Sequence, residues 1–163
     1  MRVDGRGYPP PVYVSPMAIP TQGRVLAVDW GELRIGLAHS DELQLIATPL
    51  DTLVRRRGKR FPMPGFLAHC TQLAPVGLVV GYPLNEEGEE GASGRAAREL
   101  SELLARRTEL PVELWDERMS TVAALDSIRH QGGRTRGRRE EVDAIAATVV
   151  LQGWLEARRQ GSR

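Results

Sequence analysis

The feature that most constrains the fold is an apolar run that ends abruptly in an acid. Residues 24–29 read Arg-Val-Leu-Ala-Val-Asp, a nearly continuous pattern that is typical of a central strand buried on both faces. The apolar pattern resumes over 34–40 and again over 45–53 after short polar connections. Because short connections favour antiparallel hairpins, we predict a three-stranded meander. Pro49 places the third strand at an edge of the sheet or at a strand end.

The remainder of the chain alternates between helical and extended patterns. The expected elements are helices over about 64–73, 93–107 and 140–158, a further helix that begins at Ser120, and strands over 76–81 and 111–115. A meander followed by alternating helices and strands predicts an α/β three-layer domain with a mixed five-stranded sheet. A chain of 163 residues is long enough for one such domain with a sizeable core.

The two ends of the chain differ in composition from this domain. Residues 1–22 are rich in proline and contain no continuous apolar segment. We therefore expect a disordered tail there rather than a signal peptide, with either Met1 or Met17 as the true start. The folded domain is expected over 23–159, and a flexible C-terminus over 160–163.

Composition excludes several classes of function. The net charge is only +1, so nucleic-acid binding would have to come from local basic patches. The lone Cys70 excludes an intramolecular disulfide and fits a reducing cytoplasm. One cysteine and three scattered histidines offer no zinc-ligand spacing. No apolar run approaches the length of about 18 residues that a membrane span needs. We therefore expect a cytoplasmic protein with no membrane partner.

Acids stand at three places where an unpaired carboxylate would be costly. Asp29 ends the first strand, Asp116 and Glu117 follow the strand over 111–115, and Asp143 lies on the apolar face of the last helix. Each acid at the rim of a core needs a partner. Because the three places are far apart in the sequence, a shared cation is the simplest partner, and divalent cations such as Mg²⁺ prefer oxygen ligands. The pattern predicts a metal-dependent site in which the second ligand is Glu117 or Asp116.

Each acid also has an ordinary structural interpretation. Asp29 and Gly31 are common turn residues. Asp116 is a candidate cap for the helix that follows, and Glu117 a candidate for a solvated ion pair. Asp143 lies in the first turn of its helix, where the helix dipole favours an acid.

Basic and loop residues near these acids are candidate substrate contacts. An arginine-rich loop immediately before the last helix is suited to hold a phosphodiester backbone through Arg134, Arg136, Arg138 and Arg139. A solvated charged loop is the alternative for this cluster, and it is the more typical interpretation of a second basic cluster over 55–60. Asn85 and Tyr82 follow the strand over 76–81 and are placed to line the same cleft.

Four sequence blocks together resemble the YqgF/RuvX family of bacterial proteins. The blocks are Asp29-x-Gly31-x-x-Arg34-Ile-Gly36-x-Ala38-x-Ser40-Asp41, Gly81-x-Pro83-Leu-Asn85, Asp116-Glu-Arg-x-Ser-Thr-Val-Ala123 and Val142-Asp-Ala-Ile-Ala-Ala147. They occur in family order and cover about residues 24–158. The family belongs to the RNase H-like superfamily, and its members are described as pre-16S rRNA nucleases or Holliday junction resolvases. The chain departs from the family pattern at Glu32-Leu33, where the family usually has Thr followed by Lys or Arg.

The resemblance implies an RNase H-like fold with a metal-binding triad at Asp29, Glu117 and Asp143. Two Mg²⁺ or Mn²⁺ ions would then assist phosphodiester hydrolysis. The matched blocks also contain candidate substrate contacts at Gly31, Arg34, Asn85, Arg118, Ser120 and Thr121.

The function implied is maturation of the 5′ end of precursor 16S rRNA, and resolution of four-way DNA junctions is the alternative. The partner would be RNA or branched DNA, and the chain a monomer or a homodimer. An actin-like ATPase also starts with Asp-x-Gly on a hairpin, but it needs a duplicated domain that 163 residues cannot supply. A non-catalytic nucleic-acid adaptor has no need to retain all three acids.

Overall fold

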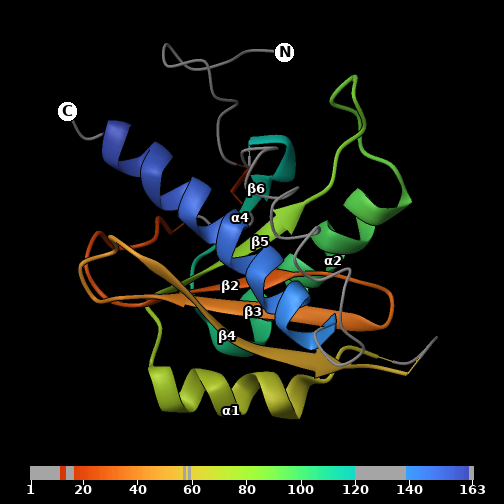
Figure 1. Cartoon of the computed structure of the whole chain (residues 1–163), viewed down its shortest axis with the longest axis horizontal. Helices are drawn as coiled ribbons and strands as arrows, with labels where there is room; N and C mark the ends of the chain where they lie inside the picture. The colour runs from red at the N-terminus through yellow and green to blue at the C-terminus, as the bar shows by residue number, and fades with distance from the viewer. Residues whose placement is uncertain (1–11, 14–16, 57, 59, 120–138, 162–163) are drawn as a thin grey trace.

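The computed structural model describes residues 12–13, 17–56, 58, 60–119 and 139–161. Within these ranges the strands form one six-stranded sheet of order β1-β6-β5-β2-β3-β4, which lies between helices (Figure 1). The strands are β1 (Val12–Tyr13), β2 (Val25–Asp29), β3 (Arg34–Ser40), β4 (Ala47–Val54), β5 (Gly77–Tyr82) and β6 (Val112–Asp116). The helices are α1 (Met63–Leu73), α2 (Ala92–Thr108), the 3₁₀ turn η1 (Glu117–Met119) and α4 (Arg139–Gly161).

The pairing of the strands confirms the predicted mixed α/β sheet. β2, β3 and β4 pair antiparallel as a meander, and Pro49 lies in the edge strand β4, where a missing backbone donor is tolerated. β5 pairs parallel to β2, and β6 pairs parallel to β5. The carboxyl ends of β2, β5 and β6 therefore meet at one end of the sheet.

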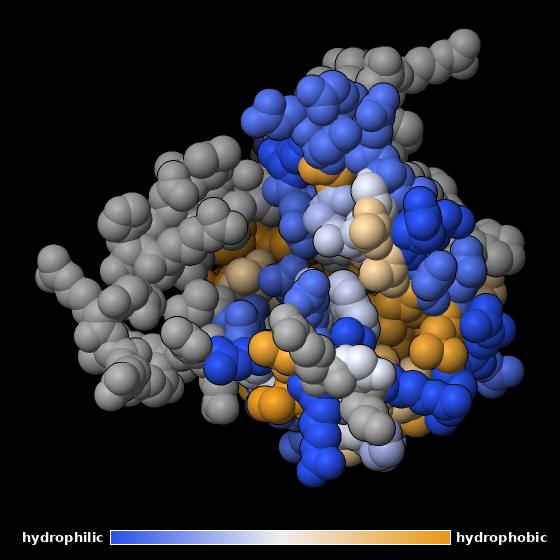
Figure 2. Space-filling model, turned by 90° about the vertical axis from the view of Figure 1, so that its right-hand side faces the viewer, coloured by the Kyte–Doolittle hydropathy of each residue, from blue (hydrophilic) through white to orange (hydrophobic). Residues whose placement is uncertain are grey.

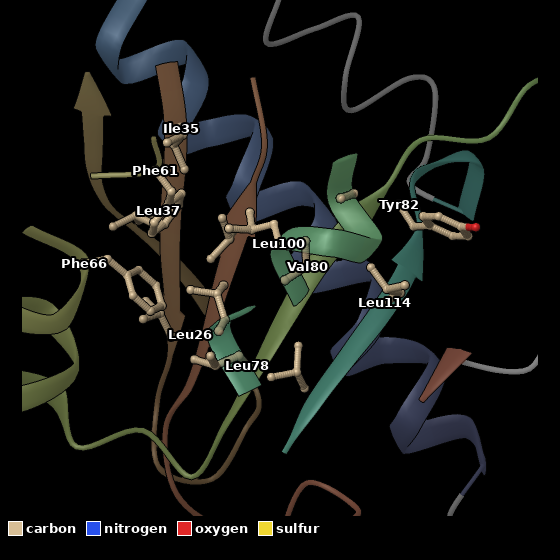
Figure 3. Packing of buried hydrophobic residues seen from close by; sticks show 14 of the residues in the cluster. Leu26, Ile35, Leu37, Phe61, Phe66, Leu78, Val80, Tyr82, Leu100 and Leu114 are labelled. Atoms are coloured by element: carbon tan, nitrogen blue, oxygen red, sulfur yellow. The ribbon is translucent and has the colours of Figure 1, made fainter. Parts of the chain in front are cut away.

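The two faces of the sheet bury alternate residues of each strand. Leu26 and Val28 of β2 belong to a core that includes Phe66 of α1 and residues of α2 (Figure 3). Val25 and Ala27 belong to a second core on the opposite face, which α4 covers. We call these the α1/α2 face and the α4 face. A residue's position along its strand thus decides which helix layer it meets.

α4 approaches the sheet closely at Gly36 of β3. A Cβ atom at Gly36 would overlap the main-chain carbonyl of Asp143, so only a residue without a side chain allows the two backbones to lie so close. Gly36 is also the register partner of Asp29. Further along α4, Ala147, Val150 and Trp154 are buried, as predicted for its apolar face.

The prediction of a disordered tail over 1–22 is wrong at the positions that the structure describes. β1 pairs antiparallel with β6, and Ile19 is only 1% exposed in the core of the α4 face. Gln44 holds this segment by donating from Nε2 to the carbonyl of Pro20 at 2.8 Å. The sheet consequently has one strand more than predicted. Residues 1–11 and 14–16 lie outside the described part of the chain.

Two other expectations concern the second half of the chain. The helix expected to begin at Ser120 lies outside the described residues. α4 continues to Gly161, so the prediction of a flexible end over 160–163 is wrong for residues 160 and 161, which are helical. Residues 162–163 lie outside the described part of the chain. Among the helices that are described, none is long and apolar enough to cross a membrane.

We expect Gly36→Ala to lower the free energy of unfolding by about 2–3 kcal/mol, because α4 must move away from β3 to admit the methyl group. Urea denaturation of the purified variant measures the change. Gly91→Ala is a matched control, since a Cβ there meets nothing within 4 Å, and its change is expected to stay below about 1 kcal/mol. Equal stabilities of the two variants would contradict the close approach.

Candidate active site

The sheet topology brings the sequence-predicted acids of β2 and β6 to one end. Asp29 is the last residue of β2, and Glu117 follows the last residue of β6. The parallel register pairs Val28 with Val80 and Tyr82 with Asp116. Residues at the ends of β2, β5 and β6 therefore lie side by side, although they come from distant parts of the chain.

Asp29 and the Glu117 carboxylate lie on the same face of the sheet. Asp29 follows Val25 and Ala27 in the period-two pattern that points to the α4 face. Gly81, at the end of β5, points to that face too, and a Cβ there would lie 2.6 Å from Oε1 of Glu117. The absence of a side chain at Gly81 thus lets the Glu117 carboxylate lie over β5, beside the end of β2.

Asp143 reaches the same place from the helix layer. Its main-chain carbonyl lies against Gly36, the residue that pairs with Asp29. The Asp143 side chain is about one-third exposed, and its Oδ2 is 3.9 Å from Nη1 of Arg34. The structure therefore places Asp29, Glu117 and Asp143 on the α4 face near the carboxyl ends of β2 and β5. We call this region the acidic end of the sheet.

Asp116 faces the other way. It lies in the same alternation as Leu114, which belongs to the core of the α1/α2 face, and it is only 7% exposed. Arg118 donates from Nε to both carboxylate oxygens at 3.0 Å and from Nη2 to Oδ2 at 2.6 Å. Hydrogen bonding to Asp116 raises the pKa of the Arg118 guanidinium above its ordinary value. The Asp116 carboxylate is thus bound within the fold, whereas Glu117 lies at the acidic end.

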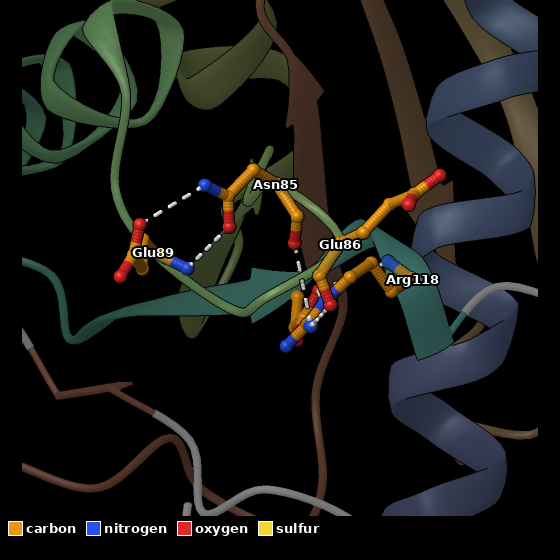
Figure 4. Close-up of polar contacts among 5 residues, drawn as sticks. Asn85, Glu86, Glu89 and Arg118 are labelled. Atoms are coloured by element: carbon orange, nitrogen blue, oxygen red, sulfur yellow. Dashed lines mark hydrogen bonds and ion pairs between the residues drawn. The ribbon is translucent and has the colours of Figure 1, made fainter.

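Two predicted substrate contacts, Arg118 and Asn85, hold the loop after β5 (Figure 4). Nη1 of Arg118 lies 3.4 Å from the carbonyl oxygens of Asn85 and Glu86. The side-chain Oδ1 of Asn85 accepts a hydrogen bond from the backbone N–H of Glu89 at 2.7 Å. In this structure both side chains connect the loop to itself and to the end of β6. Any contact with substrate would be additional to these interactions.

The other predicted contacts are distributed as follows. Gly31 lies in the turn between β2 and β3, where a Cβ would overlap the carbonyl of Arg34, so its absence of a side chain keeps the turn tight. Arg139 begins α4, but its side chain is not among the described ones. The remaining predicted contacts lie outside the described residues: Ser120, Thr121, Arg134, Arg136 and Arg138.

The acidic end has the donor type of a hard-cation site. Carboxylate oxygens are the ligands that Mg²⁺ and Mn²⁺ prefer. Among the side chains that the structure describes, no group of three His, Cys, Asp or Glu lies close enough together to hold a metal ion. The structure therefore brings the three acids to one end and one face of the sheet without forming a three-ligand cluster.

Sequence reasoning did not assign Gly36 and Gly81 to the site. Both are glycines inside buried strands, where glycine often marks the close approach of another group. That signal was available in the sequence, but it does not say which group approaches. Only the fold identifies the partners as the Asp143 backbone and the Glu117 side chain.

We expect Arg118→Ala to destabilise the fold by about 3 kcal/mol, because it leaves the Asp116 carboxylate buried without its guanidinium partner. Chemical denaturation measures the loss. Arg98→Ala breaks a more exposed ion pair with Glu90 and should change the stability far less, because surface ion pairs contribute little. The double variant Asp116→Asn/Arg118→Gln should recover part of the loss. If Arg118→Ala lowered the free energy of unfolding no more than Arg98→Ala, the Asp116–Arg118 ion pair would not stabilise the fold.

Comparison with known proteins places this arrangement in a family. The family described as "RuvX: Holliday junction resolvase" matches residues 23–157. A protein of Anaeromyxobacter sp. (strain Fw109-5) named "Putative pre-16S rRNA nuclease" is 47% identical over 135 residues, which are 83% of this chain and 98% of that protein. A protein of Mycolicibacterium paratuberculosis with the same name is 41% identical over 145 residues, 88% of this chain and 86% of that one.

Solved structures show the same fold at lower sequence identity. The structure titled "T. thermophilus RuvC in complex with Holliday junction substrate" covers 85% of this chain and 96% of its own, with a TM-score of 0.55 and 18% identity. A second structure of Thermus thermophilus RuvC has a TM-score of 0.52. Since the family match spans most of the sequence and the fold agrees, the chain belongs to the RuvX family.

Proposed function

We propose that this chain is a divalent-metal-dependent nuclease whose site is formed by Asp29, Glu117 and Asp143. The observation that carries the proposal is the gathering of these three acids on the α4 face at the acidic end of the sheet. Gly36 and Gly81 are the positions that admit two of them, the Asp143 backbone and the Glu117 side chain. The relatives' names support nuclease chemistry.

The donor chemistry supports Mg²⁺ or Mn²⁺ as the cofactor, with two ions proposed. Asp29, Glu117 and Asp143 would hold them, and when bound the ions would supply a Lewis acid and an activated water. Other parts of the fold hold two of these ligands in position. Asp29 ends a strand buried in both cores, so its backbone is firmly held. Arg34 lies beside Asp143 at 3.9 Å and orients that carboxylate.

Precursor 16S rRNA is the substrate that we propose first, with cleavage that matures its 5′ end in the cytoplasm. The names of the related proteins from Anaeromyxobacter and Mycolicibacterium favour it. Resolution of four-way DNA junctions is the second candidate, favoured by the family description. Cutting two strands of a junction symmetrically requires a homodimer, so the oligomeric state measured with the active protein bears on the choice.

Asp29→Asn should lower the rate of cleavage by at least about a thousandfold, because it removes a proposed metal ligand and with it several kcal/mol of transition-state stabilisation. Matched RNA substrates with the precursor 5′ end and four-way DNA junctions, each tested in Mg²⁺ and in Mn²⁺, show which substrate is cut. Excess chelator should abolish cleavage by the unmodified protein and addition of the metal should restore it. Unchanged turnover in the variant, or cleavage in chelator, would overturn the proposal.

Gly81→Ala is expected to lower kcat by about tenfold to a hundredfold with little loss of stability. The added Cβ would displace the Glu117 carboxylate, and small misplacements of a reacting group are costly. The displaced atom is the end of a flexible side chain, so the fold can accommodate it. Single-turnover rates and thermal unfolding together test this expectation. A variant with a normal rate would show that Glu117 does not act from its position over Gly81.

A further inference from the structure

A groove opens next to the acidic end, and most of its lining has no role in the proposed metal site. It has a volume of about 700 Å³ and lies between the β2–β3 turn, the end of β4 and the start of α4. In Figure 1 this turn and the end of β4 lie at the right-hand edge of the molecule. The residues that matter for the argument are Leu33, Arg34, Val54, Arg55, Arg56 and Asp143. Because Asp143 belongs to both, the groove leads directly to the proposed site.

The walls of the groove are held in place by contacts within the fold. The backbone N–H of Arg55 donates to the carbonyl of Leu33 at 2.9 Å, which continues the β3–β4 pairing beyond the end of β4. Nε of Arg55 donates to the carbonyl of Glu32 at 2.6 Å, and its guanidinium lies over the Trp30 ring at 4.4 Å. The groove is therefore preformed, and binding would need little ordering of its walls.

The chemistry of the lining fits a phosphodiester backbone. Arg34, Arg55 and Arg56 bring three guanidinium groups to the groove, against the acids Glu32 and Asp143. Guanidinium groups suit phosphate oxygens because they offer several donors in one plane. Leu33 is 49% exposed and Val54 is 64% exposed, so apolar surface for sugar carbons lies beside the charges. Figure 2 looks onto this side of the molecule, where mostly hydrophilic residues surround smaller hydrophobic patches.

The same lining offers little for reading bases. Trp30, the aromatic residue at this turn, stacks on Phe61 with ring centroids 6.0 Å apart and also carries the Arg55 guanidinium. Its ring is thereby engaged within the protein instead of being presented to a base. Contacts to phosphate position a nucleic acid without carrying sequence information. Recognition along this groove should therefore be independent of sequence.

We propose that this groove binds the backbone of the nucleic-acid substrate on one side of the bond to be cut, with Arg56 as a phosphate contact. The inference rests on the proposed nuclease function and adds to it a surface that leads the strand to Asp143. Arg56 is exposed, so its side chain can be removed without disturbing the walls. Glu32 is exposed on the same groove, and its carboxylate would repel the bound backbone. The two residues are thus expected to affect binding in opposite directions.

Binding measurements in the Asp29→Asn background, with chelator present, separate this inference from catalysis. The probes are a labelled RNA with the precursor 16S 5′ end and a labelled four-way DNA junction. On whichever probe the parent binds, Arg56→Ala should weaken affinity roughly tenfold. It should also reduce the slope of log affinity against log salt by about 0.7–0.9, the value for one phosphate contact. Glu32→Gln should tighten binding, and scrambling the probe sequence should change none of these effects.

Arg107→Ala is the matched control. Arg107 is an exposed arginine in the last turn of α2. Because α2 precedes the start of β6, Arg107 lies away from the carboxyl ends of the strands, where the groove and the proposed site are. Its loss should leave affinity and salt slope unchanged, and unfolding curves verify that each variant is folded. If Arg56→Ala matched Arg107→Ala while the parent bound and the unmodified protein cleaved, the groove assignment would be wrong and the nuclease function would stand. If the parent bound neither probe and the unmodified protein with metal cut neither, both the groove assignment and the nuclease function would be overturned.

Discussion

The contact between α4 and β3 at Gly36 is the interaction on which the rest of the site depends. A side chain at that position would overlap the carbonyl of Asp143, so the helix can rest on the sheet only where the strand has no Cβ. Since Gly36 pairs with Asp29, this single close approach brings a helical acid to the end of a central strand. The buried Ala147 and Trp154 then continue the same packing along the helix.

The two faces of the sheet carry different groups at the carboxyl ends of β2, β5 and β6. On the α4 face, Asp29 and Glu117 lie at the end of the sheet and Asp143 joins them. On the α1/α2 face, Asp116 is bound by Arg118, which also reaches the carbonyls of the loop after β5. The neighbouring acids Asp116 and Glu117 thus lie on opposite faces, because Asp116 ends β6 on the α1/α2 face whereas Glu117 begins η1 with its carboxylate over Gly81. The α1/α2 face holds the loop after β5, and the α4 face carries the carboxylates of the proposed metal site.

Local patterns were enough to predict the meander, the helices α1, α2 and α4, and the elements on which Asp29 and Asp143 lie. They failed where contacts span long separations. The pairing of Val12 and Tyr13 with β6 joins segments about a hundred residues apart, and no short-range pattern in a proline-rich segment indicates it. Arg118 was predicted to contact substrate because it lies in one of the sequence blocks that resemble the family. In the fold its guanidinium is engaged by Asp116 and by loop carbonyls.

The sequence by itself determined the α/β class and the presence of three acids at the ends of apolar segments. Both depend only on the spacing of apolar residues and on the positions of charged residues along the chain. It left Glu117 and Asp116 as alternatives. Only the tertiary structure decided that Glu117 lies over Gly81 at the acidic end and that Arg55 and Arg56 line a groove leading to Asp143. The physical reason is that strand register, the face to which a side chain points and helix-to-sheet distance arise from packing between segments that are distant in sequence.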